Sequence, residues 1–379
     1  MSGADASGSA PGWQIGTLRG VPVYLGRTWP VIAVVIVALF GPQLQDQRPD
    51  LGAKAYLVAA IYAVLLLISV LVHEAAHALM GQARGYRVSR IVADLWGGHT
   101  AYEHADTSPG STALVAVVGP LSNGVLALIA WLALPATPDG VPETLVAVVA
   151  WSNALVAAFN MLPGLPLDGG YLVDALVWRI TGSRAKGMVV AGWCGRVVTV
   201  AVLAWALLRP LLQGESPSLV TVAWSVFLAT FLWAGASASI RAGQVKHIVD
   251  RVPLRSVADP LTILDDSTPV AALDLMPPGP VAVHSESRGL WGLVDTQAVA
   301  AIPPGSREHA VLASVARAQP AGWAIQVPSM DADVSDVLGA VQASGAEQVV
   351  VITREDPRAV GLVVTQRLAD ALRQADGRT

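Results

Sequence analysis

Charged residues and cysteine are scarce in this sequence. Only 14% of its 379 residues are Asp, Glu, Lys or Arg, compared with about 25% in an ordinary soluble domain, and 53% are hydrophobic. The basic residues form no cluster that would indicate a nucleic-acid partner. The single cysteine, Cys194, rules out an intrachain disulfide and is expected to be a small buried apolar residue. The composition therefore argues against nucleic-acid binding and favours a protein with a large apolar part.

Long apolar runs fall almost entirely before about residue 240. A helix that spans a membrane needs about 20 mostly apolar residues. Six segments approach this requirement: Trp29–Leu44, Ala55–Ala83, Thr112–Leu134, Thr144–Leu162, Met188–Leu212 and Leu219–Ile240. We therefore expect an α-helical polytopic membrane protein with about six transmembrane helices, followed by a soluble α/β domain.

The limits of the apolar region divide the chain into three predicted parts: a polar N-terminus, a membrane domain and a soluble domain. Residues 1–13 are small and polar and are expected to be disordered, without the basic and apolar regions of a cleaved signal peptide. A membrane domain over residues 14–247 and a cytoplasmic domain over residues 248–379 follow.

Lysine and arginine in the loops predict the orientation, because cytoplasmic loops carry an excess of both. Residues 137–143 and 213–218 contain neither. Basic residues follow the second and sixth segments: Arg84, Arg87, Arg90, Arg241, Lys246, Arg251 and Arg255. Both termini are therefore expected on the cytoplasmic side of a bacterial plasma membrane.

The second apolar segment ends in a metal-ligand pattern, His73-Glu74-Ala75-Ala76-His77. Residues i and i+4 lie on one face of a helix, so both imidazoles can reach one metal ion. The Glu74 carboxylate can hold a water at that metal and take its proton during attack on a peptide carbonyl. The alternative is a solvated helix end outside the bilayer. No charged residue lies between Ala55 and Val72, which favours a site within the membrane.

A third ligand is expected after the fourth apolar segment, because catalytic zinc typically has three protein ligands. Two prolines stop the helix there, and Asp168 follows at the predicted depth of the histidines. Asp168 is the candidate ligand; alternatively, it caps a helix over Gly169–Arg179. Asn160 is a candidate for hydrogen bonding to substrate backbone, or for holding helices together.

The other polar candidates are assigned structural roles. Asn123, in Gly119-Pro120-Leu121-Ser122-Asn123, is expected to be a packing residue. The remaining histidines have no ligand-like partner at helical spacing and are expected on the surface: His99, His104, His247, His284 and His309.

These motifs together resemble the site-2 proteases, a family of intramembrane zinc metalloproteases. The resemblance covers about residues 14–245. Two motifs carry it together: His73-Glu74-Ala75-Ala76-His77 and Asn160-x-x-Pro-x-x-Pro-Leu-Asp168-Gly. In addition, Leu95-Trp96-Gly97-Gly98 is similar to the family's membrane-associated hairpin. Gly119-Pro120-x-x-Asn123 is similar to its third-span motif.

The resemblance implies His73, His77 and Asp168 as zinc ligands, Glu74 as catalytic base and Asn160 as a substrate-positioning residue. It implies a core of three transmembrane helices and a role in regulated intramembrane proteolysis. The implied partner is a transmembrane protein substrate such as an anti-sigma factor. A branch of the family with six spans and a C-terminal tandem of cystathionine-β-synthase-type (CBS) domains is the most similar.

The soluble tail contains an internal repeat. Residues 292–300 align with residues 361–369, with identical Gly, Leu, Val, Thr, Gln and final Ala. Short strands are predicted before a helix in each copy: Pro280–His284, Leu290–Val294, Gln348–Ile352 and Ala359–Val364. The pattern resembles a CBS pair, which often binds adenosine nucleotides and often dimerises. Neither Thr296–Ala300 nor Thr365–Ala369 contains the aspartate that holds the ribose, so an interaction module without nucleotide is favoured and a homodimer is expected.

Two other functions compete with a zinc metalloendopeptidase. A transporter or channel with a CBS gate would explain broken helices, but the sequence has no paired broken helices in repeated halves. A catalytically inactive homologue would not need the intact set of two histidines, Glu74 and Asp168. The protease is therefore the preferred interpretation.

Overall fold

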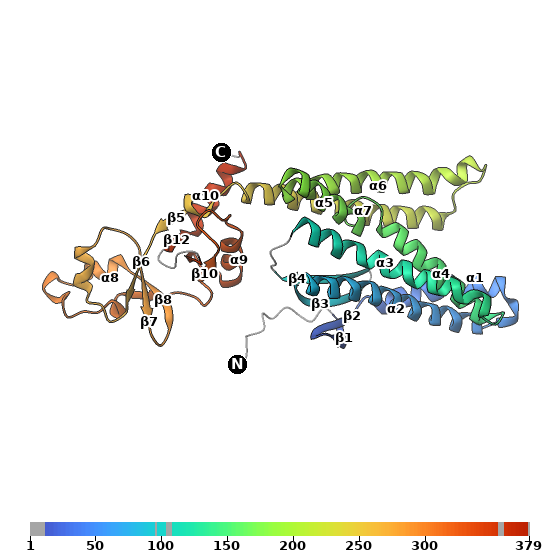
Figure 1. Cartoon of the computed structure of the whole chain (residues 1–379), viewed down its shortest axis with the longest axis horizontal. Helices are drawn as coiled ribbons and strands as arrows, with labels where there is room; N and C mark the ends of the chain where they lie inside the picture. The colour runs from blue at the N-terminus through green and yellow to red at the C-terminus, as the bar shows by residue number, and fades with distance from the viewer. Residues whose placement is uncertain (1–11, 95–96, 104–107, 355–359, 378–379) are drawn as a thin grey trace. The chain divides into compact units, whose positions relative to one another are not determined.

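The computed structural model describes residues 12–94, 97–103, 108–354 and 360–377 (Figure 1). The chain divides into two compact units, Met1–Gln244 and Val245–Thr379. The first unit is mostly helical, and the second combines short strands with short helices.

Six helices in the described residues are long and apolar enough to cross a membrane. They are α1 (Trp29–Gln47), α2 (Lys54–Ala83), α3 (Pro109–Ala133), α4 (Val141–Asn160), α6 (Arg184–Leu212) and α7 (Leu219–Val249). These six helices match the six segments expected from the sequence and are consistent with a multi-pass membrane protein. An additional helix, α5 (Asp168–Thr181), has 14 residues and is too short to span a bilayer.

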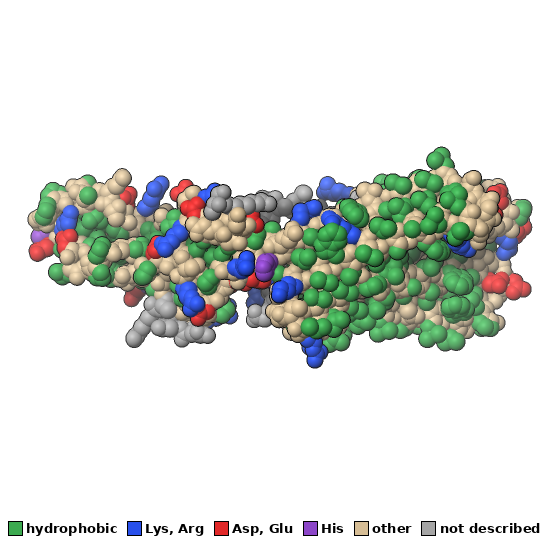
Figure 2. Space-filling model, turned by 90° about the horizontal axis from the view of Figure 1, so that it is seen from above, with side chains coloured by type: hydrophobic (Ala, Val, Ile, Leu, Met, Phe, Trp, Pro, Cys, Tyr) green, Lys and Arg blue, Asp and Glu red, His purple; other side chains and the backbone are tan. Residues whose placement is uncertain are grey.

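The outer faces of the long helices are apolar. Figure 2 shows hydrophobic side chains covering the helical unit, with charged side chains gathered toward the helix ends. Leu132 and Val197, for example, are 72% and 67% exposed. Exposed apolar surface of this extent fits contact with lipid rather than with water.

Helix α3 is central to the packing of this unit, because it contacts α2, α4 and α5. Small buried residues on α3, among them Ala116, Gly119 and Ala127, allow its neighbours to approach closely. This arrangement brings α2 and the start of α5, which are far apart in the sequence, to the same region of the unit.

A four-stranded sheet in the order β1-β2-β3-β4 completes the first unit. Its strands are β1 (Gly12–Leu18), β2 (Val21–Gly26), β3 (Arg87–Asp94) and β4 (Gly97–Glu103). β2 and β3 are parallel, whereas β3 and β4 pair antiparallel as a hairpin. The hairpin expected around Gly97 is therefore present, although Leu95 and Trp96 lie outside the described residues.

The expectation of disorder over residues 1–13 is wrong at its end. Gly12 and Trp13 belong to β1, where they pair with Gly26 and Leu25 of β2. The pairing partners follow a tight turn at Arg19, which composition alone does not reveal. Residues 1–11 lie outside the described residues.

The second unit contains two four-stranded sheets of the same design. The first has β6 (Thr262–Asp265), β7 (Val281–Ser285), β8 (Gly289–Val294) and β9 (Ala316–Ala318); the second has β10 (Ala324–Val327), β11 (Gln348–Thr353), β12 (Val360–Val364) and β5 (Ala258–Pro260). Each sheet has one parallel pair followed by two antiparallel pairs. The four strands expected from the repeat are present within a residue of their predicted bounds.

Short helices accompany the strands of this unit. α8 (Thr296–Ala301) follows β8 and α10 (Thr365–Ala375) follows β12, whereas α9 (Ser335–Ser344) lies between β10 and β11. Leu293 of the first repeat and Val350 of the second lie in one buried cluster, so the two copies share a core. The sequence repeat is therefore also a structural repeat.

Candidate metal centre

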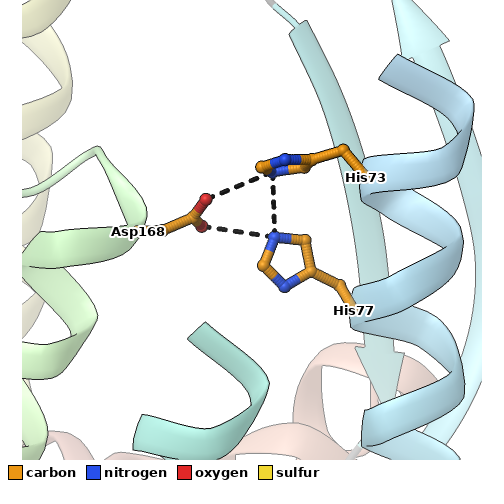
Figure 3. Close-up of side chains that lie close together, drawn as sticks. All are labelled: His73, His77 and Asp168. Atoms are coloured by element: carbon orange, nitrogen blue, oxygen red, sulfur yellow. Dashed lines mark hydrogen bonds and ion pairs between the residues drawn. The ribbon is translucent and has the colours of Figure 1, made fainter. Parts of the chain in front are cut away.

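His73 and His77 lie one turn apart on α2, and both are buried. Their Nε2 atoms are 3.0 Å apart. Figure 3 shows both rings projecting from the same face of the helix toward Asp168. The helical spacing therefore directs both imidazoles to a single point, as the sequence pattern predicts.

Asp168 faces the two histidines from the first turn of α5. Its carboxylate oxygens lie 3.2 Å from Nε2 of His73 and 3.4 Å from Nε2 of His77. Leu167, rather than Asp168, is the N-cap residue of α5. The alternative interpretation of Asp168 as a helix cap is therefore wrong, and its side chain completes a group that can hold a metal ion.

The loop before Asp168 is held in place by α6. The Leu165 amide donates a hydrogen bond to the Ala191 carbonyl, at 3.1 Å. A β-carbon on Gly164 or Gly195 would overlap the backbone of the facing segment. The glycines therefore permit the backbone contact that fixes the start of α5 opposite α2.

The hydrogen bonds of the two rings indicate which nitrogen of each carries the proton. Nδ1 of His73 lies 2.5 Å from Oδ1 of Asn123, and Nδ1 of His77 lies 2.7 Å from the Val115 carbonyl. Both oxygens can only accept, so both Nδ1 atoms are the donors. Each Nε2 then carries a lone pair in the neutral ring.

The centre of this group is therefore suited to a cation. Two Nε2 lone pairs and a carboxylate converge there, and acceptors do not stabilise one another. Their separations of 3.0 to 3.4 Å are close to the edge of about 3.3 Å expected for tetrahedral zinc with ligand bonds of 2.0–2.1 Å. Two imidazoles and one carboxylate also match a ligand set of catalytic zinc, so the residues present fit this metal.

Gly119 of α3 leaves the space in which the two rings meet. A β-carbon at this position would overlap Nε2 of His77 and crowd Nε2 of His73. The glycine of the Gly119-Pro120 motif is therefore a steric requirement of the centre.

Comparisons with known proteins agree with this geometry. Residues 135–204 match the sequence profile of peptidase family M50. A candidate zinc metalloprotease of Synechocystis sp. is 31% identical over 238 residues, which cover 62% of this chain and 61% of the relative. The candidate zinc metalloprotease Rip3 of Mycobacterium tuberculosis is 37% identical over 219 residues, covering 55% of this chain and 54% of the relative.

The chain therefore resembles peptidase family M50 over residues 135–204, and candidate zinc metalloproteases over 55–62% of its length. The chain spans 61% and 54% of the length of these two relatives. Among solved structures, a site-2 protease of Methanocaldococcus jannaschii aligns with 60% of the chain and 95% of its own length, at 20% identity and a TM-score of 0.43.

The other predicted site residues, Glu74 and Asn160, lie outside the group of converging ligand atoms. Glu74 is buried on α2 beside His73. Asn160 is the partly exposed last residue of α4, where the chain turns toward Asp168. The structure thus brings His73, His77 and Asp168 together, while Asn160 lies at the start of the loop that leads to them.

Asn123 departs from its expected role. It is buried and contacts His73 directly, so its description as a packing residue is wrong. Its amide also contacts Asn153 of α4, a residue not singled out in the sequence. An asparagine within an apolar span was the available signal, since such residues need a polar partner.

The remaining histidines follow expectation where they are described. His247, His284 and His309 are exposed. The side chains of His99 and His104 lie outside the described part of the chain. Cys194 is a free thiol that is partly rather than fully buried.

Proposed function

We propose that this protein is a zinc metalloendopeptidase that cleaves transmembrane protein substrates within or beside the bilayer. The observation that carries the proposal is the convergence of His73, His77 and Asp168 on one point. It is supported by the buried carboxylate of Glu74, one residue after the first ligand.

The chemistry divides between the metal and the chain. Held by His73, His77 and Asp168, zinc would supply Lewis acidity, which would lower the pKa of water toward 7 and polarise a carbonyl. Glu74 takes the proton of the attacking water and delivers it to the departing amide nitrogen. Asn160 hydrogen-bonds the substrate backbone and holds the scissile peptide in register.

Substrate entry requires local unwinding. In an intact membrane helix, each carbonyl is shielded by the helix's own hydrogen bonds, and lipid offers no water for hydrolysis. We infer that the substrate unwinds near the cytoplasmic end of α2, where the site is reached by water. Both termini then lie in the cytoplasm of a bacterial cell, as the loop arginines predict.

The second unit is proposed to be a CBS pair that regulates cleavage. Its two sheets of identical order and its shared core support a tandem of this kind. We favour dimerisation through this unit over nucleotide binding, because neither Thr296–Ala300 nor Thr365–Ala369 contains the expected aspartate. A membrane-bound regulator such as an anti-sigma factor is the proposed class of substrate.

The proposal is tested by counting zinc per chain in detergent-purified protein, in the wild type and in His77→Ala and Asp168→Ala. We expect about one zinc per wild-type chain and a large loss in both variants, because each removes one of three ligands. A monodisperse wild-type protein without zinc would overturn the proposal. Retention of zinc in Asp168→Ala alone would remove Asp168 from the ligand set.

A further inference from the structure

A chain of buried hydrogen bonds runs from His73 away from the metal centre. Asn123, Asn153 and Ser69 form it, and they are 1%, 1% and 6% exposed. They come from α3, α4 and α2, which pack against one another. We call these three residues the amide relay. The catalytic roles described above leave Asn153 and Ser69 without any assigned function.

The direction of each bond in the amide relay is fixed from its far end. Ser69 Oγ donates to the Leu65 carbonyl, at 3.1 Å. Asn153 Nδ2 donates both to Ser69 Oγ, at 3.0 Å, and to the Val149 carbonyl, at 2.9 Å. A main-chain carbonyl can only accept, so the amide nitrogen of Asn153 must face these two oxygens. Its Oδ1 is thereby directed toward Asn123.

The same reasoning continues to the histidine. Asn123 Nδ2 donates to Asn153 Oδ1, at 2.7 Å, which leaves Asn123 Oδ1 facing Nδ1 of His73, at 2.5 Å. Nδ1 of His73 must then carry the proton, and its Nε2 presents a lone pair to the metal. A flipped Asn123 amide would lose both bonds, because NH₂ would face N–H and oxygen would face oxygen.

We propose that Asn153 is a positioning residue that sets the tautomer of His73 through Asn123. This inference rests on the proposed function, because the tautomer matters only if His73 binds a metal. Partners that orient a ligating histidine typically change metal affinity by about 10- to 100-fold when removed. His77 needs no such relay, since its Nδ1 is fixed directly by the Val115 carbonyl.

The decisive variants exploit the chemistry of the Asn123 side chain. Asn153→Leu removes the group that holds the amide of Asn123, so the flipped amide becomes accessible. Asn123→Asp replaces the amide by a carboxylate, both of whose oxygens accept hydrogen bonds. Either orientation of this carboxylate therefore presents an acceptor to Nδ1 of His73. In the Asn123→Asp background, loss of Asn153 should therefore have little effect. Thr199→Val removes an equally buried helix hydrogen bond on α6 and serves as the matched control.

The experiment measures Zn²⁺ affinity by competition with a chromophoric chelator, on full-length monodisperse protein in detergent. We expect Asn153→Leu to bind Zn²⁺ about 10- to 100-fold more weakly than the wild type. Against Asn123→Asp alone, the double variant should change by less than about twofold, and Thr199→Val should match the wild type. With Co²⁺ in place of zinc, the visible absorption spectrum of Asn153→Leu should differ from that of the wild type, because one imidazole leaves the metal. The spectrum of Thr199→Val should match the wild type.

Three results would overturn the inference. Equal affinity in the wild type and Asn153→Leu would show that the amide relay does not act on His73. An equal loss in both backgrounds would assign Asn153 a structural role only. Absence of Zn²⁺ binding in the wild-type protein would overturn the proposed function itself. This result differs from the first two, in which the wild type binds Zn²⁺.

Discussion

The two histidines of the metal site are oriented by different means. A main-chain carbonyl of α3 fixes His77, whereas side chains from three helices fix His73. A carbonyl cannot be removed by substitution, but a side chain can. The orientation of His73 is therefore the more sensitive to mutation at a distance.

Glu74→Gln separates the two tasks expected at this site. The variant should lose roughly 10²- to 10⁴-fold or more in cleavage rate, because an amide cannot take a proton from water. Its zinc content should remain at the wild-type level, since Glu74 is not one of the converging ligands. Metal analysis beside a peptide-cleavage assay checks both.

Glu143→Gln supplies the control for that substitution. Glu143 is exposed in the first turn of α4, away from the ligand-bearing segments, and its variant should behave as the wild type. Loss of zinc in Glu74→Gln would contradict the assignment and make Glu74 a structural residue.

At the scale of the element, an ion pair between Asp174 of α5 and Arg184 at the start of α6 joins the two helices. Asp174 is 1% exposed and lies 3.9 Å from the Arg184 guanidinium. Burial raises the pKa of the Asp174 carboxyl to about 6, against an opposing effect of Arg184. The folded protein therefore binds a proton here more tightly than the unfolded chain does.

This contact predicts a pH dependence of stability. Because the pKa is raised on folding, stability should fall as pH rises from about 4 to 6, by an amount on the order of 2–3 kcal/mol. Asp174→Asn should remove this slope and unfold at a higher temperature than the wild type at pH 7. Thermal unfolding in detergent at several pH values measures both.

Asp331→Asn is the matched substitution for the pH series, since Asp331 is exposed on the surface. It should leave the slope unchanged. If the stability of Asp174→Asn fell with rising pH as steeply as that of the wild type, the pH dependence would belong to another group.

The elements differ in how far the sequence predicts them. Six helices are predictable because a bilayer requires long apolar runs, and Asp168 is predictable because two histidines require a third ligand. β1 is missed because its partner strand, not its composition, orders it. The contact of Asn123 with His73 is missed because it depends on how α2 and α3 pack.

At the scale of the whole molecule, the metal ligands lie entirely in the first unit. A chain ending at Arg251 keeps the whole of α7 and should bind the same amount of zinc as the full chain. A regulatory tail should alter the rate of cleavage without altering metal content. Zinc analysis and a cleavage assay on both chains test this, and loss of zinc from a monodisperse shortened chain would contradict it.

The second unit closes each sheet with a strand from outside its own repeat. β5 precedes both repeats in the chain yet pairs with β12, and β9, which follows the first repeat, ends the sheet of β8. Without β9 the first sheet would expose the edge of β8, and without β5 the second sheet would expose the edge of β12. Such open edges invite aggregation. A tail built this way can be inherited, lost or transplanted only as an intact pair.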